Sequence, residues 1–178
     1  MHCWKSINLE KQLGFNRLFL ISIISGTAIF SLFYVPLNLL FSHTLDDQYF
    51  LLFISSMLIL YPLHKVFHLI PLLPVIKNVR LTIVWQFSFL PIISIKVKEP
   101  IRKYIYLSSI FCPIILLNAL LLVGCWQLPN YIHYFTMLIA YHGAICTIDV
   151  IYAKYLLFCP KDAMIEESDD GFEVLVLD

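Results

Sequence analysis

The sequence predicts an all-α membrane protein with about four transmembrane helices, and three observations predict this fold class. The 178 residues are 60% hydrophobic and only 13% charged, with a mean hydropathy of +0.83. These values are too apolar for a soluble domain of this length. Four apolar runs are long enough to cross a hydrocarbon core about 30 Å thick. The loops between the first and second runs and between the third and fourth runs also contain no Lys or Arg.

The second apolar run is predicted to be broken, because it contains Pro62, Pro71 and Pro74. Each proline inside a helix removes a backbone donor and clashes with the preceding turn. We expect a helix as far as about Tyr61, then a kinked segment that is buried in protein or lines a wet cavity. All four spans belong to a single membrane domain, residues 1–178. The predicted spans and the tail are residues 18–41, 49–76 (broken), 105–128, 131–158 and 159–178.

The distribution of charge predicts the orientation in the cell membrane. Neither the loop at residues 42–48 nor the loop at residues 129–130 contains Lys or Arg. The positive-inside rule therefore places both termini in the cytoplasm. The same rule accounts for the basic residues, so the expected partner is the lipid bilayer and not a nucleic acid. The basic residues on the predicted inner side are Lys5, Lys11, Arg17, Lys77, Arg80, Lys96, Lys98, Arg102 and Lys103.

Between spans two and three, residues 79–100 alternate larger apolar residues with smaller or more polar ones. This period-two pattern predicts a short, amphipathic, two-stranded β element at the cytoplasmic surface, with Pro91 near its bend. The alternative is a solvated connector, because short alternations also arise by chance.

The tail is acidic, and Asp169, Asp170 and Gly171 stand between two apolar-leaning runs. This arrangement predicts a hairpin turn. Because charge runs are usually solvated, we expect a small cytoplasmic cap or a solvated tail that includes Glu166 and Glu167.

Apart from histidine and cysteine, two ionisable residues lie well inside the predicted spans, Lys65 and Asp149. A charge at membrane depth costs at least a few kcal/mol, so each needs a partner or a function. The helical rise from Gln48 to His64 is about 24 Å, and that from Asn130 to Asp149 is about 28 Å. The two polar positions therefore agree in depth to about one helical turn.

Two helix faces carry potential metal ligands. His64 and His68 are four residues apart, and His142, Cys146 and Asp149 follow an i, i+4, i+7 stripe. A catalytic zinc needs three protein ligands and an open position for water. His64, His68 and Asp149 satisfy that count, whereas His142 lies about 10 Å along the axis from Asp149. The residues assigned to a supporting or pathway role are His142, Cys146 and Asn118.

The same residues allow a structure without metal. Lys65 and Asp149 can form an ion pair, while His64 and His68 bond to backbone carbonyls that the prolines expose. A lone HxxxH is a weak motif, and spacing leaves both alternatives open.

Five segments in order resemble a family of small bacterial membrane proteins described as zincin peptidases, related in outline to the site-2-type intramembrane metalloproteases. The resemblance covers roughly residues 50–175. It implies zinc as cofactor, His64 and His68 as ligands at the place of HExxH, and Asp149 as the third ligand. It also implies a peptide or membrane-protein substrate. The five segments are "PLHKVFHLIP", "LTIVWQFSFLPIISIKVKEP", "CPIILLNALLL", "YHGAICTIDVIYAKYL" and "CPKDAMIEESDDGFEVLV".

Position 65 departs from the family pattern. In HExxH the glutamate takes a proton from the zinc-bound water and returns one to the leaving amine. Lys65 has the opposite charge and repels a metal ion, so no residue is assigned as catalytic. The sequence therefore predicts a multi-pass membrane protein that binds metal and whose peptidase chemistry is degenerate or altered.

Two other functions fit the sequence less closely. The alternative is a membrane interaction or regulatory protein without metal, which binds partner helices or peptides in the same groove. An ion or small-molecule carrier is a third possibility, although four spans without an internal repeat are few for a transporter.

Overall fold

The computed structural model describes residues 2–41, 44–86, 90–97, 99–168 and 171–176, with the backbone alone at residues 10, 78, 81–86, 90–95 and 168. The chain divides into two compact units. The sheet unit consists of Met1–Gly14, Lys65–Cys112 and Ile151–Asp178. The helical unit consists of Phe15–His64 and Pro113–Val150.

Within the described residues, four helices are long and apolar enough to cross a membrane. Large apolar side chains on them, such as Leu51 and Leu58, are exposed, as expected of helices that face lipid. The predicted fold class, four apolar helices with small strand elements, is confirmed. The helices are α2 (Phe15–Phe41), α3 (Phe50–Leu69), α4 (Lys103–Gln127) and α5 (Ile132–Leu157), the last preceded by the short 3₁₀ helix η2 (Pro129–Tyr131).

The prediction that the second helix ends near Tyr61 is wrong. Helix α3 continues through Pro62 to Leu69, and a turn then leads into the 3₁₀ helix η1 (Leu73–Asn78). A single proline costs one backbone hydrogen bond, which neighbouring groups can replace in a membrane helix. The break therefore falls at the next two prolines, because a residue before proline disfavours helical backbone.

Small residues bring α2 and α5 together within the helical unit. A Cβ atom added at Gly26 would lie 3.1 Å from the Cβ atom of Ala144. The hydroxyls of Ser25 and Thr147 share a hydrogen bond in the same region. Close approach through small residues is the usual way that membrane helices associate.

The two loops that lack Lys and Arg meet at one end of the helical unit. The backbone N–H of Asp46 donates to the carbonyl of Asn130, with 3.1 Å between the nitrogen and the oxygen. The hydroxyl of Tyr131 donates to Asp46, and Nε2 of His133 lies 3.0 Å from a carboxylate oxygen of Asp47. These contacts hold the connection between α2 and α3 against the start of α5.

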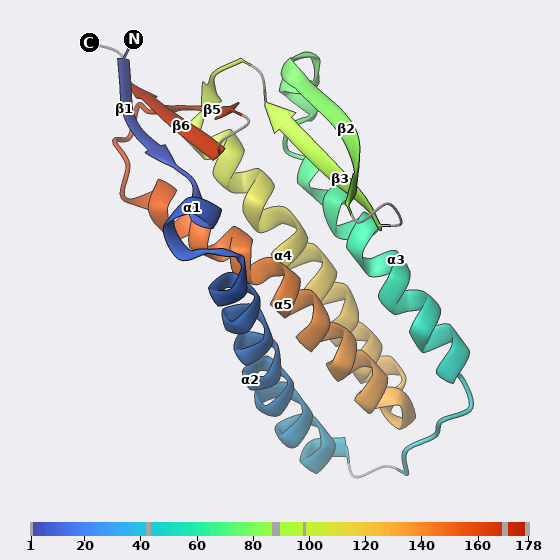
Figure 1. Ribbon diagram of the computed structural model, residues 1–178. Helices are drawn as coiled ribbons and strands as arrows, with labels where there is room; N and C mark the ends of the chain where they lie inside the picture. The colour runs from blue at the N-terminus through green and yellow to red at the C-terminus, as the bar shows by residue number, and fades with distance from the viewer. Residues whose placement is uncertain (1, 42–43, 87–89, 98, 169–170, 177–178) are drawn as a thin grey trace. The chain divides into compact units, whose positions relative to one another are not determined.

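A four-stranded antiparallel sheet forms much of the sheet unit, in the order β1 (His2–Ile7), β6 (Gly171–Val176), β5 (Met164–Ser168) and β4 (Ile101–Arg102). Figure 1 shows β1 and β6, the first and last strands, side by side. The predicted C-terminal hairpin is confirmed, since Ser168 pairs with Gly171. Sequence patterns did not predict β1.

Gly171 is required where β6 begins. Its φ is +127°, and an added Cβ atom would lie 2.3 Å from the carbonyl oxygen of Ile7. Only glycine combines this backbone conformation with so close an approach of β1.

The predicted β element between spans two and three is confirmed as two antiparallel strands, β2 (Val79–Gln86) and β3 (Leu90–Val97). Val79 pairs with Val97 at one end, and Trp85 pairs with Pro91 next to the connection. Pro91 therefore stands near the bend, as expected. The side-chain alternation that predicted these strands lies outside the described residues.

Lys103 fixes the start of α4 to the end of α5. It is buried, and its ammonium donates to the carbonyl oxygens of Cys159 at 2.6 Å and Leu157 at 3.3 Å. A cation at a helix C-terminus satisfies carbonyls that have no partner within the helix. This contact positions the turn that leads from α5 into β5.

Candidate metal centre

In the helical unit, His64 lies between two side chains of α5. It is 1% exposed. Its Nδ1 is 3.1 Å from Nε2 of His142, and its Nε2 is 3.1 Å from Oδ2 of Asp149. The two α5 residues are about two helical turns apart, so the imidazole of His64 fits between them. The predicted agreement in depth between His64 and Asp149 is confirmed.

Asn118 on α4 determines the protonation of His142. The amide Nδ2 of Asn118 donates to the carbonyl of Ile114 at 2.8 Å, so its Oδ1 is turned toward Nδ1 of His142, 3.0 Å away. An amide oxygen can only accept, and Nδ1 of His142 therefore carries the proton. Nε2 of His142 is left as an acceptor that faces His64.

His64 can donate from Nδ1 to this acceptor. Its Nε2 then directs a lone pair at the carboxylate of Asp149. Two acceptor atoms 3.1 Å apart repel each other unless a cation lies between them. That cation can be a proton, which makes an imidazolium–carboxylate pair, or a metal ion. Two ligand atoms of one tetrahedral zinc are about 3.3 Å apart. The residues therefore fit a zinc ion.

Cys146 adds a potential metal ligand on the Nδ1 side of His64. Its buried Sγ lies 3.4 Å from Nε2 of His142 and 3.8 Å from Nδ1 of His64. The three donor atoms lie within 4.8 Å of one another. If Nδ1 of His64 carries no proton, these residues form a His₂Cys set, with Asp149 as acceptor for Nε2–H. His64 can thus bind a metal ion in two ways, through Nε2 together with Asp149 or through Nδ1 together with His142 and Cys146.

In the sheet unit, His68 is bonded to α4. Its Nδ1 is 2.9 Å from the carbonyl oxygen of Ser109, and the hydroxyl of Ser109 donates to the carbonyl of His68 at 2.6 Å. Because a carbonyl can only accept, Nδ1 of His68 carries the proton and Nε2 is the nitrogen with a lone pair. This tautomer is the one that a metal-ligating histidine adopts when its other nitrogen bonds to the protein.

The five predicted residues that belong to the helical unit are brought together there, and the other two lie in the next turn of α3, within the sheet unit. No predicted site residue falls outside these two groups. The first group is His64, Asn118, His142, Cys146 and Asp149, and the second is Lys65 and His68.

Glu167 on β5 is a polar residue of the sheet unit whose position the sequence did not predict. One carboxylate oxygen accepts from the hydroxyl of Tyr106, and the other accepts from the backbone N–H of Val97 at 3.0 Å. Burial raises the pKa of Glu167 above its ordinary value, and these two bonds together with the charge of Lys65 oppose the rise. Of the two alternatives for the tail, a small cap describes this residue better than a solvated tail does.

A pattern in the sequence could have placed Glu167. Alternate residues of a strand share a face, so Glu167 lies on the face of Ile165, which is fully buried. Its cross-strand partner is Phe172, also buried. The alternation was missed because the run of acidic residues predicted a solvated segment.

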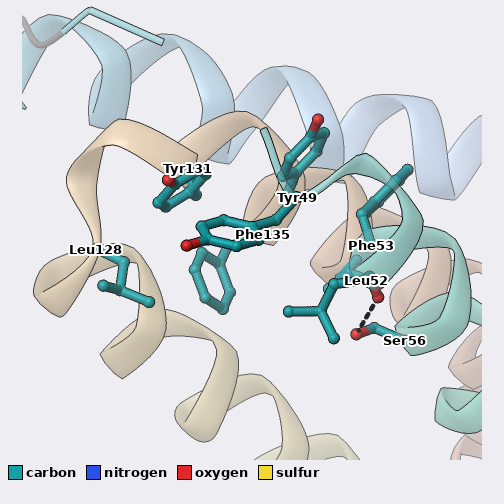
Figure 2. Close-up of a pocket in the computed structure, with 9 residues that line it drawn as sticks. Tyr49, Leu52, Phe53, Ser56, Leu128, Tyr131 and Phe135 are labelled. Carbon is teal, nitrogen blue, oxygen red and sulfur yellow. Dashed lines mark hydrogen bonds between the residues drawn. The ribbon is translucent and has the colours of Figure 1, made fainter. Parts of the chain in front are cut away.

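The helical unit also contains an apolar pocket of about 230 Å³ beside the first turns of α3 (Figure 2). Its lining has tyrosine hydroxyls and the hydroxyl of Ser56, which bonds to the carbonyl of Leu52 (Figure 2). None of the lining residues is His, Cys, Asp or Glu, the residue types that bind zinc in proteins. The lining residues are Tyr49, Leu52, Phe53, Ser56, Leu128, Tyr131, Tyr134, Phe135 and Leu138.

Residues 57–164 match the model of a family described as "Putative zincin peptidase". The match covers more than half of the chain, and the chain belongs to this family. It includes α3 from Met57 onward, both strands β2 and β3, and the whole of α4 and α5. No curated protein and no solved structure matches the chain.

Proposed function

We propose that this protein is a zinc-binding membrane protein with peptidase ancestry, in which zinc is held by His64, His68 and Asp149. The observation that carries the proposal is the approach of Nε2 of His64 to Oδ2 of Asp149 at 3.1 Å, a distance that suits two ligands of one metal ion. Membership of a zincin peptidase family supports zinc as that ion.

The histidine environments support the same ligand set. Helix α3 is continuous from Phe50 to Leu69, so His64 and His68 are one turn apart on one helix. His68 carries its proton on Nδ1, so the lone pair lies on Nε2. His142 accepts from Nδ1 of His64 and is itself oriented by Asn118, so Nε2 of His64 carries the lone pair that faces Asp149. In this proposal His142 and Asn118 orient a ligand, as partners of metal-bound histidines commonly do.

A bound zinc polarises a carbonyl and activates water. The chain must then supply a group that accepts the water's proton, and position 65 does not supply it, because Lys65 is a cation. We therefore expect the site to be catalytically degenerate or to hydrolyse peptides by an altered mechanism. Strands β2 and β3 suit an extended peptide or an unfolded stretch of a membrane protein as the ligand, since a peptide can add to a sheet edge by backbone pairing.

The proposed location is the cell membrane, with both termini in the cytoplasm and lipid as the immediate surroundings. The four apolar helices support the membrane, and the pairing of β1 with β6 supports a common side for the two chain ends. The orientation rests on the distribution of Lys and Arg.

Metal analysis of the purified protein tests the proposal. We expect about one zinc per chain in the native protein and none in His64→Ala, since a catalytic-type site has three protein ligands. A native protein without stoichiometric metal would contradict it. Detergent-extracted protein refilled with zinc and desalted gives the reference for metal lost during purification.

A second function fits one observation equally well. A proton on Nε2 of His64 gives an imidazolium–Asp149 pair at the same 3.1 Å. The protein would then be a non-catalytic interaction or regulatory protein of the membrane, and the polar cluster would fix the packing of its helices. In that case Asp149→Asn destabilises the fold without any effect of a chelator on the native protein.

A further inference from the structure

Lys65 presents an electrostatic problem for a metal centre on α3. It is adjacent to His64 and three residues before His68 on the same helix. An ammonium this close to a zinc ion repels it, and half-burial of the side chain weakens screening by solvent. A negative charge near Lys65 would offset this repulsion, and the HExxH pattern would have placed one at position 65 itself.

Helix α4 brings a carboxylate to the same part of the sheet unit. The hydroxyl of Tyr106 bonds to Glu167, and three residues later the backbone carbonyl of Ser109 bonds to His68. Residues three apart on a helix lie on one face, separated by about 4.5 Å along the axis. Glu167 and His68 therefore bond to two residues of one face of α4.

Glu167 is partly buried, and its hydrogen bonds favour the charged form of the carboxyl group. The bonds from Tyr106 and from the N–H of Val97 satisfy both carboxylate oxygens. Lys65 is three residues before His68 and therefore lies on the same face of α3. Burial raises the pKa of Glu167, and the bonds from Tyr106 and Val97 together with the charge of Lys65 act in the opposite direction. A buried charge persists only when such partners compensate its desolvation.

We propose that Glu167 is the counter-charge of Lys65, so that β5 supplies to the metal centre the negative charge that the family motif carries at position 65. Glu167 lies beyond residues 57–164, the part of the chain that matches the family model. It is a positioning residue that acts through the field at Lys65 and His68. This inference rests on the proposed function for its effect on zinc, but the pairing of the two charges can be measured without metal.

Zinc affinity is the first measurement, made by competition with a chromophoric chelator on the full chain in detergent. Glu167→Gln keeps the size of the side chain and removes its charge, and we expect zinc binding about 10- to 100-fold weaker. Lys65→Met should bind zinc more tightly than the native protein. The double variant restores the net charge and should return to within about threefold of native affinity. Glu166→Gln is the matched control, because successive side chains of a strand face opposite sides.

Thermal unfolding of the metal-free protein is the second measurement. At neutral pH, Lys65→Met leaves the partly buried Glu167 carboxylate without its counter-charge and should lower the melting temperature. In the Glu167→Gln background the same substitution should change it much less. The difference should vanish at pH values below 4.5, the ordinary pKa of glutamate, where the carboxyl is neutral.

The outcomes separate the two proposals. If Glu167→Gln binds zinc as tightly as Glu166→Gln does, the inference is overturned, whereas the metal proposal is unaffected. If the native protein binds no zinc, the metal proposal fails. The thermal unfolding measurements alone then test the pairing of Glu167 with Lys65. Equal effects of Lys65→Met in both backgrounds overturn the pairing.

Discussion

Nε2 of His142 lies 3.1 Å from Nδ1 of His64, and this contact connects Asn118 on α4 to the proposed ligand on α3. The amide of Asn118 is fixed by the carbonyl of Ile114, so the order of donors and acceptors runs from His64 through His142 to Asn118. When Nδ1 of His64 donates in this contact, the lone pair on Nε2 faces Asp149.

The first prediction concerns this chain of hydrogen bonds. Asn118→Leu removes the acceptor that orients His142, and we expect zinc affinity to fall about 10- to 100-fold. Asn118→Asp keeps an acceptor oxygen and should stay close to the native affinity. Chelator competition measures both, and an Asp variant as weak as the Leu variant would contradict the assigned direction.

The second prediction concerns pH. Burial holds the pKa of Glu167 above 4.5, so the folded protein binds more protons than the unfolded chain just above that pH. Stability should therefore decrease as pH rises from about 4.5 through the folded pKa. Glu167→Gln lacks the titrating group, and its melting temperature should decrease less over the same interval. Parallel curves for the native protein and the variant would refute this assignment.

The third prediction concerns hydrolysis. Lys65→Glu restores the proton-transferring group of HExxH, which is worth about 10²- to 10⁴-fold in rate. We expect weak, chelator-sensitive cleavage of a membrane-embedded model peptide by Lys65→Glu and none by Lys65→Ala. Cleavage should be stronger when Glu167→Gln is added, because two neighbouring carboxylates otherwise repel.

Two results would overturn this view of position 65. Chelator-sensitive cleavage by the native protein that Lys65→Ala abolishes would make the lysine itself the working base. Cleavage by Lys65→Glu that persists in His64→Ala would show that zinc at His64 is not involved.

The fourth prediction concerns topology. Single cysteines placed at Asp47 and Asn130 should react with a membrane-impermeant maleimide from the outside of intact cells, because neither loop contains Lys or Arg. A cysteine at Lys161, in the turn after α5, should react only after the membrane is opened. Labelling of the two loops from the cytoplasmic side alone would invert the orientation.

Hydropathy predicted the four long helices because a run of about 20 apolar residues is the length that a helix needs to cross the hydrocarbon core. Period-two alternation likewise predicted β2 and β3. The course of α3 through Pro62 could not be predicted, since the cost of one proline depends on whether neighbours replace the lost bond. Strand β1 was missed because its sequence, HCWKSI, becomes a strand by pairing with β6 at the other end of the chain.

The candidate site was predictable in its residue types but not in its connections. The i, i+4, i+7 stripe of α5 identified His142, Cys146 and Asp149, and equal depth identified His64 as a neighbour of Asp149. Helical rise alone, however, made His142 look remote. The ring of His64 lies between His142 and Asp149 and contacts one with each nitrogen. No rule of residue spacing predicts this arrangement.

The zinc content of a matched set of variants tests the central claim most directly. Elemental analysis should give about one zinc per chain for the native protein and for Cys146→Ser, and little or none for His64→Ala, His68→Ala and Asp149→Asn. This pattern is the result that zinc held by His64, His68 and Asp149 predicts. Loss of zinc in Cys146→Ser, with retention in His68→Ala, would move the metal to the His₂Cys set of His64, His142 and Cys146. A native protein without zinc would contradict the claim altogether.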